Sequence, residues 1–207
     1  MRAARLSARV AMAAAAAAFA AIAFDVATGG PLSALDRPLS DWFRGHAGTA
    51  LGDSMRFVST LHAPRGILAA SVVVALILLW RRELRGLAMF VVAVAGGASL
   101  NAALKHTFEW PRPDFDGAAL GATDFSFPSG HVANATLLYG AVALLVLPRL
   151  WGRVARTGVV AAAAAMVLLV AASRLVLGAH YPTDVIAAIA EGVAWLALVC
   201  RLAGDCR

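Results

Sequence analysis

Hydrophobic residues occur along this chain in six long runs that are separated by shorter polar segments. The runs cover about residues 8–26, 64–80, 86–104, 130–147, 158–177 and 183–202. Most of them approach the roughly 20 apolar residues that an α-helix needs to cross the hydrocarbon core of a bilayer. A backbone in lipid must satisfy its own hydrogen bonds, so each run predicts a helix. The pattern therefore predicts an all-α, polytopic membrane protein with a bundle of six transmembrane helices.

The first run follows Arg2, Arg5 and Arg9, and it allows two interpretations. Small residues near positions 21–23 would suit the cleavage site of a secretory signal peptide. We prefer a retained span, because the run is long enough to cross a bilayer and because five spans would leave the C-terminal arginines on the less expected side. Residues 1–207 then form a single membrane-embedded domain.

A more polar interval, about residues 27–65, separates the first two spans. Apolar residues recur in it at helical spacing, in two groups that are interrupted at Gly45–Gly48: Leu35, Leu39, Trp42 and Phe43, then Leu51, Met55, Val58 and Leu61. This pattern predicts two short interfacial helices that lie on the membrane surface, with their apolar faces toward lipid or the bundle.

The composition argues against a soluble protein, because 61% of the residues are hydrophobic and only 14% are charged. The net charge of +6 raises the question of nucleic-acid binding. The basic residues are scattered between the apolar runs, however, which fits an orientation signal better than a nucleic-acid surface. Arginines gather at the N-terminus, in the links 81–85 and 149–156, and at the C-terminus. The positive-inside rule then predicts that both termini are cytoplasmic.

The same rule places three polar clusters together at the outer face of the membrane. They occupy residues 105–113, 128–131 and 173–184. The charge distribution that gives this orientation does not depend on the clusters, so their meeting at one face is an independent indication of a site.

Lys105 in the first cluster is the only lysine in the chain, beside seventeen arginines. Its compact ammonium suits a phosphate oxygen, although it could also be a chance exception to the compositional bias. Arg112 and Arg174 add planar guanidinium groups that can each hold two oxygens. Pro111 and Pro113 stiffen the turn that carries Arg112.

In the second cluster, Ser129, Gly130 and His131 open the fourth span. Ser129 offers a hydroxyl, and Gly130 lets its backbone N–H approach an oxyanion closely. His131 falls in the first turn of the helix, near whatever is bound there. Serine and glycine also form ordinary helix caps, so this cluster alone is weak evidence.

In the third cluster, Pro182 suits the first turn of a helix, which places His180 at the positive end of that helix. Asp184 follows His180 by four residues, a spacing at which a carboxylate can hold an imidazole in one tautomer. A structural hydrogen bond between two helices would use the same pair.

Together the clusters predict a phosphoryl-transfer site. Three cations and a helix start can neutralise the phosphoryl group, while one imidazole attacks and the other protonates the leaving oxygen. No carboxylate cage for Mg²⁺ is evident, and we expect Asp114, Asp116 and Asp124 to be solvated.

The three clusters resemble, without a substitution and in the same order, the signature motifs of the type 2 phosphatidic acid phosphatase superfamily. The matching residues are Lys105-x6-Arg112-Pro113, Pro128-Ser-Gly-His131 and Ser173-Arg174-x5-His180-x3-Asp184. The resemblance implies that His180 is the nucleophile that forms a phosphohistidine, that Asp184 orients it and that His131 is the general acid. It also implies a phosphate cradle of Lys105, Arg112, Ser129, Gly130 and Arg174. Members of this family need no metal ion or other cofactor, so none is expected here.

The resemblance implies a lipid phosphatase whose substrate arrives from the bilayer, with residues 27–65 as a lid or lipid-entry element. Candidate substrates are undecaprenyl diphosphate, phosphatidic acid and phosphatidylglycerol phosphate. We favour the first, because its recycling requires a phosphatase at the outer face. The alternatives are a lipid phosphotransferase that uses the same phosphohistidine, and a transporter or non-catalytic membrane protein with a dead site. The soluble vanadium haloperoxidases of the superfamily do not fit six apolar spans.

Three polar residues inside the spans allow both a functional and a structural interpretation. Asn101 lies one turn before Lys105, and Asn134 three residues after His131, so either could brace the site or form an ordinary hydrogen bond between helices. Glu191 is an intramembrane carboxylate, which is costly and often functional, but it could equally be protonated and structural.

Overall fold

The computed structural model describes residues 2–114 and 125–204, and these residues form helices joined by short connections, with no strand among them. The helices are α1 (Arg2–Thr28), α2 (Asp36–Gly45), α3 (Thr49–Leu61), α4 (Pro64–Trp80), α5 (Leu84–Val91), α6 (Gly97–Phe108), α7 (Gly130–Val146), α8 (Arg153–Val176) and α9 (Pro182–Ala203). Short helical segments are η1 (Ser33–Leu35), the π-helical η2 (Val92–Gly96) and η4 (Leu147–Arg149). The predicted all-α fold is confirmed.

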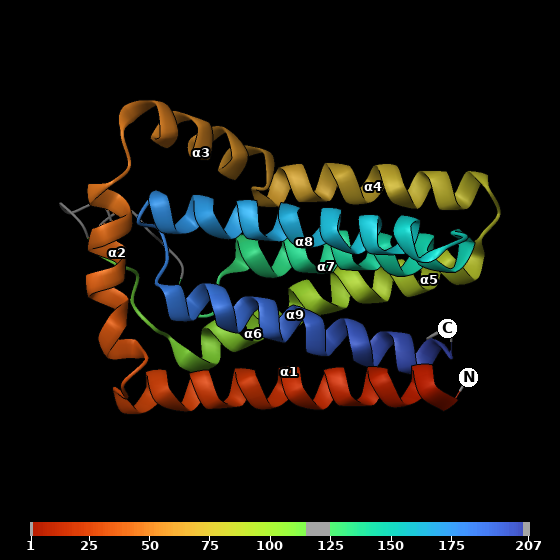
Figure 1. The fold of residues 1–207 in the computed structure, drawn as a ribbon, viewed down its shortest axis with the longest axis horizontal. Helices are drawn as coiled ribbons and strands as arrows, with labels where there is room; N and C mark the ends of the chain where they lie inside the picture. Colours follow the sequence, from red (N-terminus) through yellow and green to blue (C-terminus); the bar gives the residue numbers. More distant parts are fainter. Residues whose placement is uncertain (1, 115–124, 205–207) are drawn as a thin grey trace.

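Within the described residues, five helices are long and apolar enough to cross a membrane: Arg9–Thr28, Leu84–Phe108, Gly130–Arg149, Arg153–Val176 and Pro182–Ala203. The remaining predicted span, about residues 64–80, corresponds to α4, whose 17 residues extend only about 25 Å. α4 continues into α3 through a bend of 51°, and the two together pass the same criterion. Figure 1 shows these spans side by side, with the beginning of α1 and the end of α9 at the same end of the bundle. The six-span bundle is therefore confirmed.

The two short helices expected between the first two spans are α2 and α3. α2 lies across one end of the bundle, and α3 slants from it toward α4 (Figure 1). Several of the predicted apolar residues remain exposed, among them Trp42 on α2 and Leu51 on α3. These exposed faces agree with the predicted contact with lipid, which stays a prediction.

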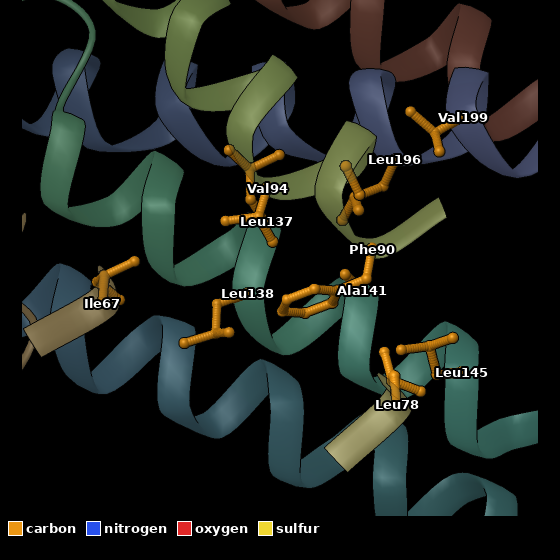
Figure 2. Packing of buried hydrophobic residues seen from close by; sticks show 11 residues of the cluster. Ile67, Leu78, Phe90, Val94, Leu137, Leu138, Ala141, Leu145, Leu196 and Val199 are labelled. Atoms are coloured by element: carbon orange, nitrogen blue, oxygen red, sulfur yellow. The ribbon is translucent and has the colours of Figure 1, made fainter. Parts of the chain in front are cut away.

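The core forms where α7 passes between α5 and α9. Phe90 of α5, Leu137 of α7 and Leu196 of α9 are buried in one cluster, and Figure 2 shows them with their neighbours. Alanines such as Ala135 of α7 and Ala187 of α9 have no exposed surface. Such small side chains let helix backbones approach closely, which is how helices associate in lipid.

The third span contains one irregularity, the π-helical turn η2 between α5 and α6. The indole Nε1 of Trp195 on α9 donates to the carbonyl oxygens of Val92 at 3.2 Å and Ala93 at 3.0 Å. A Cβ at Gly96 would lie only 2.7 Å from the Trp195 ring, so a glycine is needed for this approach. A side chain of a neighbouring helix thus binds carbonyls at the irregular turn, as backbone in lipid requires.

Two span boundaries differ from the prediction. The third span ends at Phe108 instead of near residue 104, and the fifth begins at Arg153 instead of near 158. The sequence pattern stops a span where charges begin, but long cationic side chains can reach the polar interface from a helix that continues. Lys105 consequently lies in the last turn of α6, with a helical backbone that fixes its direction.

Candidate active site

The three predicted clusters meet at the end of the bundle that α2 covers (Figure 1). Lys105 lies in the last turn of α6 and Ser129 precedes α7, while Arg174 lies in the last turn of α8 and Asp184 in the first turn of α9. His180 occupies the short connection between α8 and α9. Segments that are up to about 80 positions apart in the sequence therefore contribute to one site.

His180 and Asp184 form the buried centre of this site, with 1% and 0% of their surfaces exposed. The imidazole Nδ1 lies 3.3 Å from the Asp184 Oδ2 atom. The same oxygen accepts a hydrogen bond from the Tyr181 backbone N–H at 2.9 Å, which fixes the carboxylate at the start of α9. A carboxylate at Nδ1 leaves Nε2 as the basic nitrogen when the ring is neutral. The predicted pairing is present.

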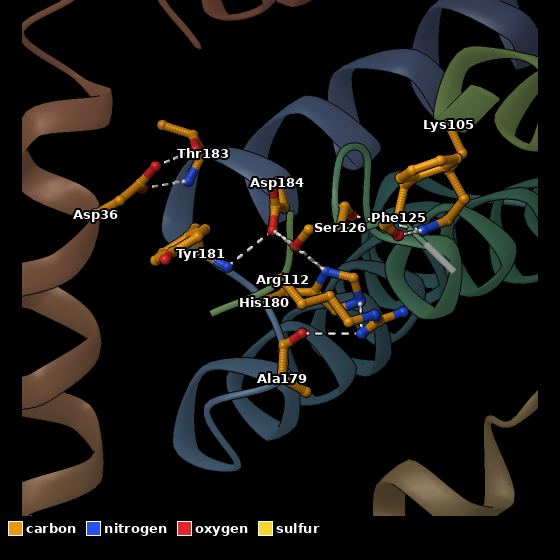
Figure 3. A network of polar contacts seen from close by, with 10 residues as sticks. All are labelled: Asp36, Lys105, Arg112, Phe125, Ser126, Ala179, His180, Tyr181, Thr183 and Asp184. Atoms are coloured by element: carbon orange, nitrogen blue, oxygen red, sulfur yellow. Dashed lines mark hydrogen bonds and ion pairs between the residues drawn. The ribbon is translucent and has the colours of Figure 1, made fainter. Parts of the chain in front are cut away.

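Arg112 lies on the other side of the imidazole. Its Nη1 atom is 3.4 Å from the His180 Nε2 atom and donates to the Ala179 carbonyl oxygen at 3.0 Å (Figure 3). The bond to Ala179 fixes the guanidinium against the backbone beside the histidine. A positive charge therefore stands next to the imidazole nitrogen that faces away from Asp184.

Ser126 is a site residue that sequence reasoning missed. Its side chain is fully buried, and its hydroxyl donates to the Asp184 Oδ2 atom and lies 3.2 Å from the His180 Nδ1 atom. Its backbone N–H donates to the Trp110 carbonyl oxygen at 2.7 Å. The serine thus connects the loop before α7 to the His180–Asp184 pair. A single serine two positions before Pro128 carries no spacing signal, because nothing in the sequence shows that it faces residue 184.

Lys105 and the start of α7 lie against each other. The Lys105 ammonium donates to the Phe125 carbonyl oxygen and lies 3.5 Å from the Ser126 carbonyl oxygen. A Cβ at Gly130 would lie 3.5 Å from the Lys105 Cε atom, so the lysine side chain runs along the first turn of α7. The structure therefore brings the first and second clusters into contact.

Ser129 connects the second cluster to the third. Its backbone N–H donates to the Asp184 carbonyl oxygen at 3.1 Å. Its hydroxyl is buried and has no hydrogen-bond partner within the part of the chain that the structure describes. Buried hydroxyls normally have a partner, so this one is available to a ligand.

The remaining two predicted residues lie near the beginning of α7 and near the end of α8. His131 follows Gly130 in the first turn of α7 and is partly buried. Arg174 is 8% exposed and donates from Nη1 to the Ser59 hydroxyl of α3. Arg174 is thereby connected to the segment 27–65, a contact that the sequence did not indicate.

Asp36 of α2 is a second feature that sequence reasoning missed. Its carboxylate accepts hydrogen bonds from the Thr183 backbone N–H at 3.0 Å and from the Thr183 hydroxyl (Figure 3). Burial raises the pKa of Asp36 to about 6, although the two hydrogen bonds from Thr183 act in the opposite direction. These bonds fix α2 to the first turn of the helix that carries Asp184.

The other polar residues singled out in the sequence are placed as follows. Asp114 is exposed, whereas Asp116 and Asp124 lie outside the described residues. Residues 2–114 and 125–204 contain no group of three or more His, Cys, Asp or Glu side chains that could hold a metal ion. Asn101 of α6 donates to Glu191 of α9 at 2.9 Å, which is a hydrogen bond between helices. The amide oxygen of Asn134 has no partner in the described part of the chain.

Comparison with known proteins extends these observations. Residues 86–207 match the PAP2 superfamily. Phosphatidylglycerophosphatase B of Bacillus subtilis (strain 168) is 32% identical over 151 residues, which cover 72% of this chain and 73% of the relative. The family match includes all three clusters between residues 105 and 184.

Two solved structures are similar. The transmembrane PAP2 type phosphatidylglycerolphosphate phosphatase from Bacillus subtilis is 25% identical and aligns with a TM-score of 0.83 over 92% of this chain and 94% of that chain. Aquifex aeolicus LpxE is 18% identical and aligns with a TM-score of 0.64 over 81% of this chain and 95% of that chain. At 18% identity, the similarity to Aquifex aeolicus LpxE shows the fold alone.

Proposed function

The chain belongs to the PAP2 superfamily, and we propose that this multi-pass membrane protein dephosphorylates a lipid through a phosphohistidine intermediate. The observation that carries the proposal is the buried imidazole of His180, which has Asp184 at Nδ1 and Arg112 at Nε2. A neutral imidazole in this setting offers a lone pair at Nε2 where a cation can hold a phosphate group.

In the first step, the His180 Nε2 atom attacks phosphorus, and the bond between phosphorus and the lipid oxygen breaks. Asp184 stabilises the positive charge that develops on the ring through the Nδ1 hydrogen bond. His131 donates a proton to the leaving oxygen. In the second step, a water molecule attacks the phosphohistidine, His131 accepts its proton, and inorganic phosphate leaves with the Nε2 lone pair restored to His180.

The phosphate oxygens carry negative charge throughout, and the cradle supplies the matching cations. Lys105, Arg112 and Arg174 provide positive charge, while the Ser129 hydroxyl and the first N–H groups of α7 donate hydrogen bonds. Gly130 has no side chain to obstruct the approach of the phosphate to these N–H groups. Ser126 holds Asp184 and His180 in position for the attack.

We propose phosphatidylglycerol phosphate as the preferred substrate. The support is the similarity to a protein named phosphatidylglycerophosphatase B and to a solved phosphatidylglycerolphosphate phosphatase. The initial preference for undecaprenyl diphosphate rested on the location of the site alone, and the relatives' names do not support it. Undecaprenyl diphosphate and phosphatidic acid therefore serve as comparison substrates.

The test is phosphate release by the purified protein in detergent with these three lipids, in the presence of EDTA. We expect the highest kcat/KM with phosphatidylglycerol phosphate, continued activity in EDTA, and inhibition by vanadate, which mimics the trigonal-bipyramidal transition state. An added alcohol that becomes phosphorylated in place of water would indicate a phosphotransferase. Loss of activity with EDTA that Mg²⁺ restores would contradict the metal-free mechanism.

We also propose that the site faces outward and that both termini are cytoplasmic. The support is that the arginine-rich links 81–85 and 149–156 lie at the end of the bundle opposite the site. A cysteine at position 45 of α2, in a chain with Cys200 and Cys206 replaced by serine, should react with a membrane-impermeant thiol reagent in intact cells. A cysteine at Trp151, which is 93% exposed, should react only after lysis. The opposite labelling pattern would show that the site faces the cytoplasm.

A further inference from the structure

A cavity of about 720 Å³ lies at the end of the bundle opposite His180. It is formed by the beginning of α5, the end of α7, the segment η4 and the last turns of α9. None of the predicted site residues lines it, so the proposed phosphatase reaction leaves this cavity without a role.

The lining of the cavity combines apolar side chains with cations. Leu84, Met89 and Leu145 contribute apolar surface, whereas Arg82, Arg85 and Arg149 contribute three positive charges. An anionic phospholipid is complementary to this lining, because its negatively charged headgroup lies next to its hydrocarbon chains.

The single acid of the lining, Glu83, does not neutralise all of these arginines. Its two oxygens bind Arg149 and Arg81, the latter at 3.2 Å. The side chains of Arg82 and Arg85 have no hydrogen-bond or ion-pair partner among residues 2–114 and 125–204. Two guanidinium groups therefore remain available to an external anion.

Two tryptophans place the cavity at the level of lipid headgroups. Trp80 ends α4 immediately before the arginine-rich link and is 83% exposed, and Trp151 lies just after η4 and is 93% exposed. Exposed tryptophans at the ends of spans mark the membrane–water interface. A lipid phosphate at this depth would meet the guanidinium groups while its acyl chains remained in the bilayer.

We propose that this cavity binds the headgroup of an anionic bilayer phospholipid that is not the substrate. Arg82 and Arg85 bind the phosphate oxygens, which planar guanidinium groups hold in pairs. Basic pockets between transmembrane helices on the cytoplasmic side are known to bind anionic headgroups. A zwitterionic lipid brings its own cation next to three arginines and binds more weakly.

The position of the cavity connects lipid binding to the catalytic end. The span that has Arg85 in its first turn has Lys105 in its last turn, and α7 and α9 carry His131 and Asp184 at the ends that lie away from the cavity. A ligand that binds only the folded bundle stabilises it by mass action. The lipid therefore holds together the three spans that supply these groups.

The test measures the binding of dioleoyl phosphatidylglycerol to the purified full chain in detergent, by native mass spectrometry and by the lipid-dependent rise of the unfolding temperature. Vanadate in all samples occupies the phosphatase site. In the Arg82→Gln/Arg85→Gln variant, we expect the apparent Kd for phosphatidylglycerol to rise about tenfold or more, because the two arginines that bind the phosphate are removed. The matched control is Arg9→Gln/Arg201→Gln, which removes the same charge from the same end outside the cavity and should change Kd less than about twofold.

Three results would overturn the proposal. The first is that the Arg82→Gln/Arg85→Gln variant binds phosphatidylglycerol as tightly as the parent does. The second is that the parent binds dioleoyl phosphatidylcholine as tightly as it binds phosphatidylglycerol. The third is that inorganic phosphate raises the unfolding temperature of the parent as much as phosphatidylglycerol does. If the double variant does not fold, a Met89→Trp variant provides the test. It keeps every arginine but fills the cavity, so we expect it to lose phosphatidylglycerol binding. Binding is measured without turnover, so these outcomes are independent of the proposed phosphatase activity.

Discussion

Replacing His180 with alanine is expected to lower kcat for phosphate release at least about 10³-fold and to leave a folded membrane protein. The substitution removes the nitrogen that attacks phosphorus, so the covalent route is lost and only the cradle remains. The imidazole is held at Nδ1 by Asp184 and Ser126 and stands beside Arg112 at Nε2. The measurement is kcat on a lipid phosphate, with the unfolding temperature recorded in parallel.

Asp184→Ala should also remove most activity, because the imidazole loses the group that orients it. This variant leaves the Tyr181 N–H and the Ser126 hydroxyl without their shared acceptor, so folding must be checked separately. His46→Ala is the control, since His46 is an exposed residue of the same end whose ring Nδ1 atom lies 2.8 Å from the Trp42 carbonyl oxygen. Near-parent turnover by His180→Ala would exclude His180 as the nucleophile.

Lys105→Arg is expected to lower kcat/KM on the order of 10²-fold, although it preserves the charge. The ammonium is bonded to carbonyl oxygens of the loop before α7, and its Cε atom lies close to Gly130. A wider, planar guanidinium in this position would displace either the loop or the phosphate, and about 1 Å of displacement is enough for such a loss. Lys105→Ala should be at least as damaging, because it also removes charge stabilisation of the transition state.

The alternative is that Lys105 serves only as a charge at the end of a span, where arginine would function equally well. The control is Arg56→Lys on α3, an exchange between the same two residue types at the same end of the bundle, which should change kcat/KM less than about twofold. Activity of Lys105→Arg within about twofold of the parent, with normal expression and folding, would show that the cradle does not require a lysine.

The spans and the three clusters could be predicted because each depends on a local property of the sequence. The length of an apolar run determines whether a helix can cross lipid, and the rare residue types of the clusters stand out in an alanine-rich chain. Ser126 and Asp36 could not be predicted in this way. Their partners lie 58 and 147 positions away, so their roles follow only from how the helices pack.

Other polar residues illustrate the same limit. His62 carried no signal in the sequence, yet it is buried and its Nε2 atom lies 2.7 Å from the Tyr139 hydroxyl of α7. Glu191 allowed two interpretations, and its hydrogen bond to Asn101 identifies at least one structural contact. The identity of the lipid substrate could not be predicted either, because the motifs determine the chemistry at phosphorus and contain no information on the rest of the lipid.

The π-helical turn η2 sets the angular phase of α6 relative to α5. One additional residue in a turn rotates everything that follows by about 100° about the helix axis, compared with an uninterrupted α-helix. Phe90 precedes the turn and Asn101 follows it, and both are buried in the bundle. Without this phase shift, Phe90 and Asn101 could not keep their present directions together, and Lys105 would turn away from the loop before α7. The glycines and Trp195 that accommodate the turn therefore determine where a cation at the far end of the same span points.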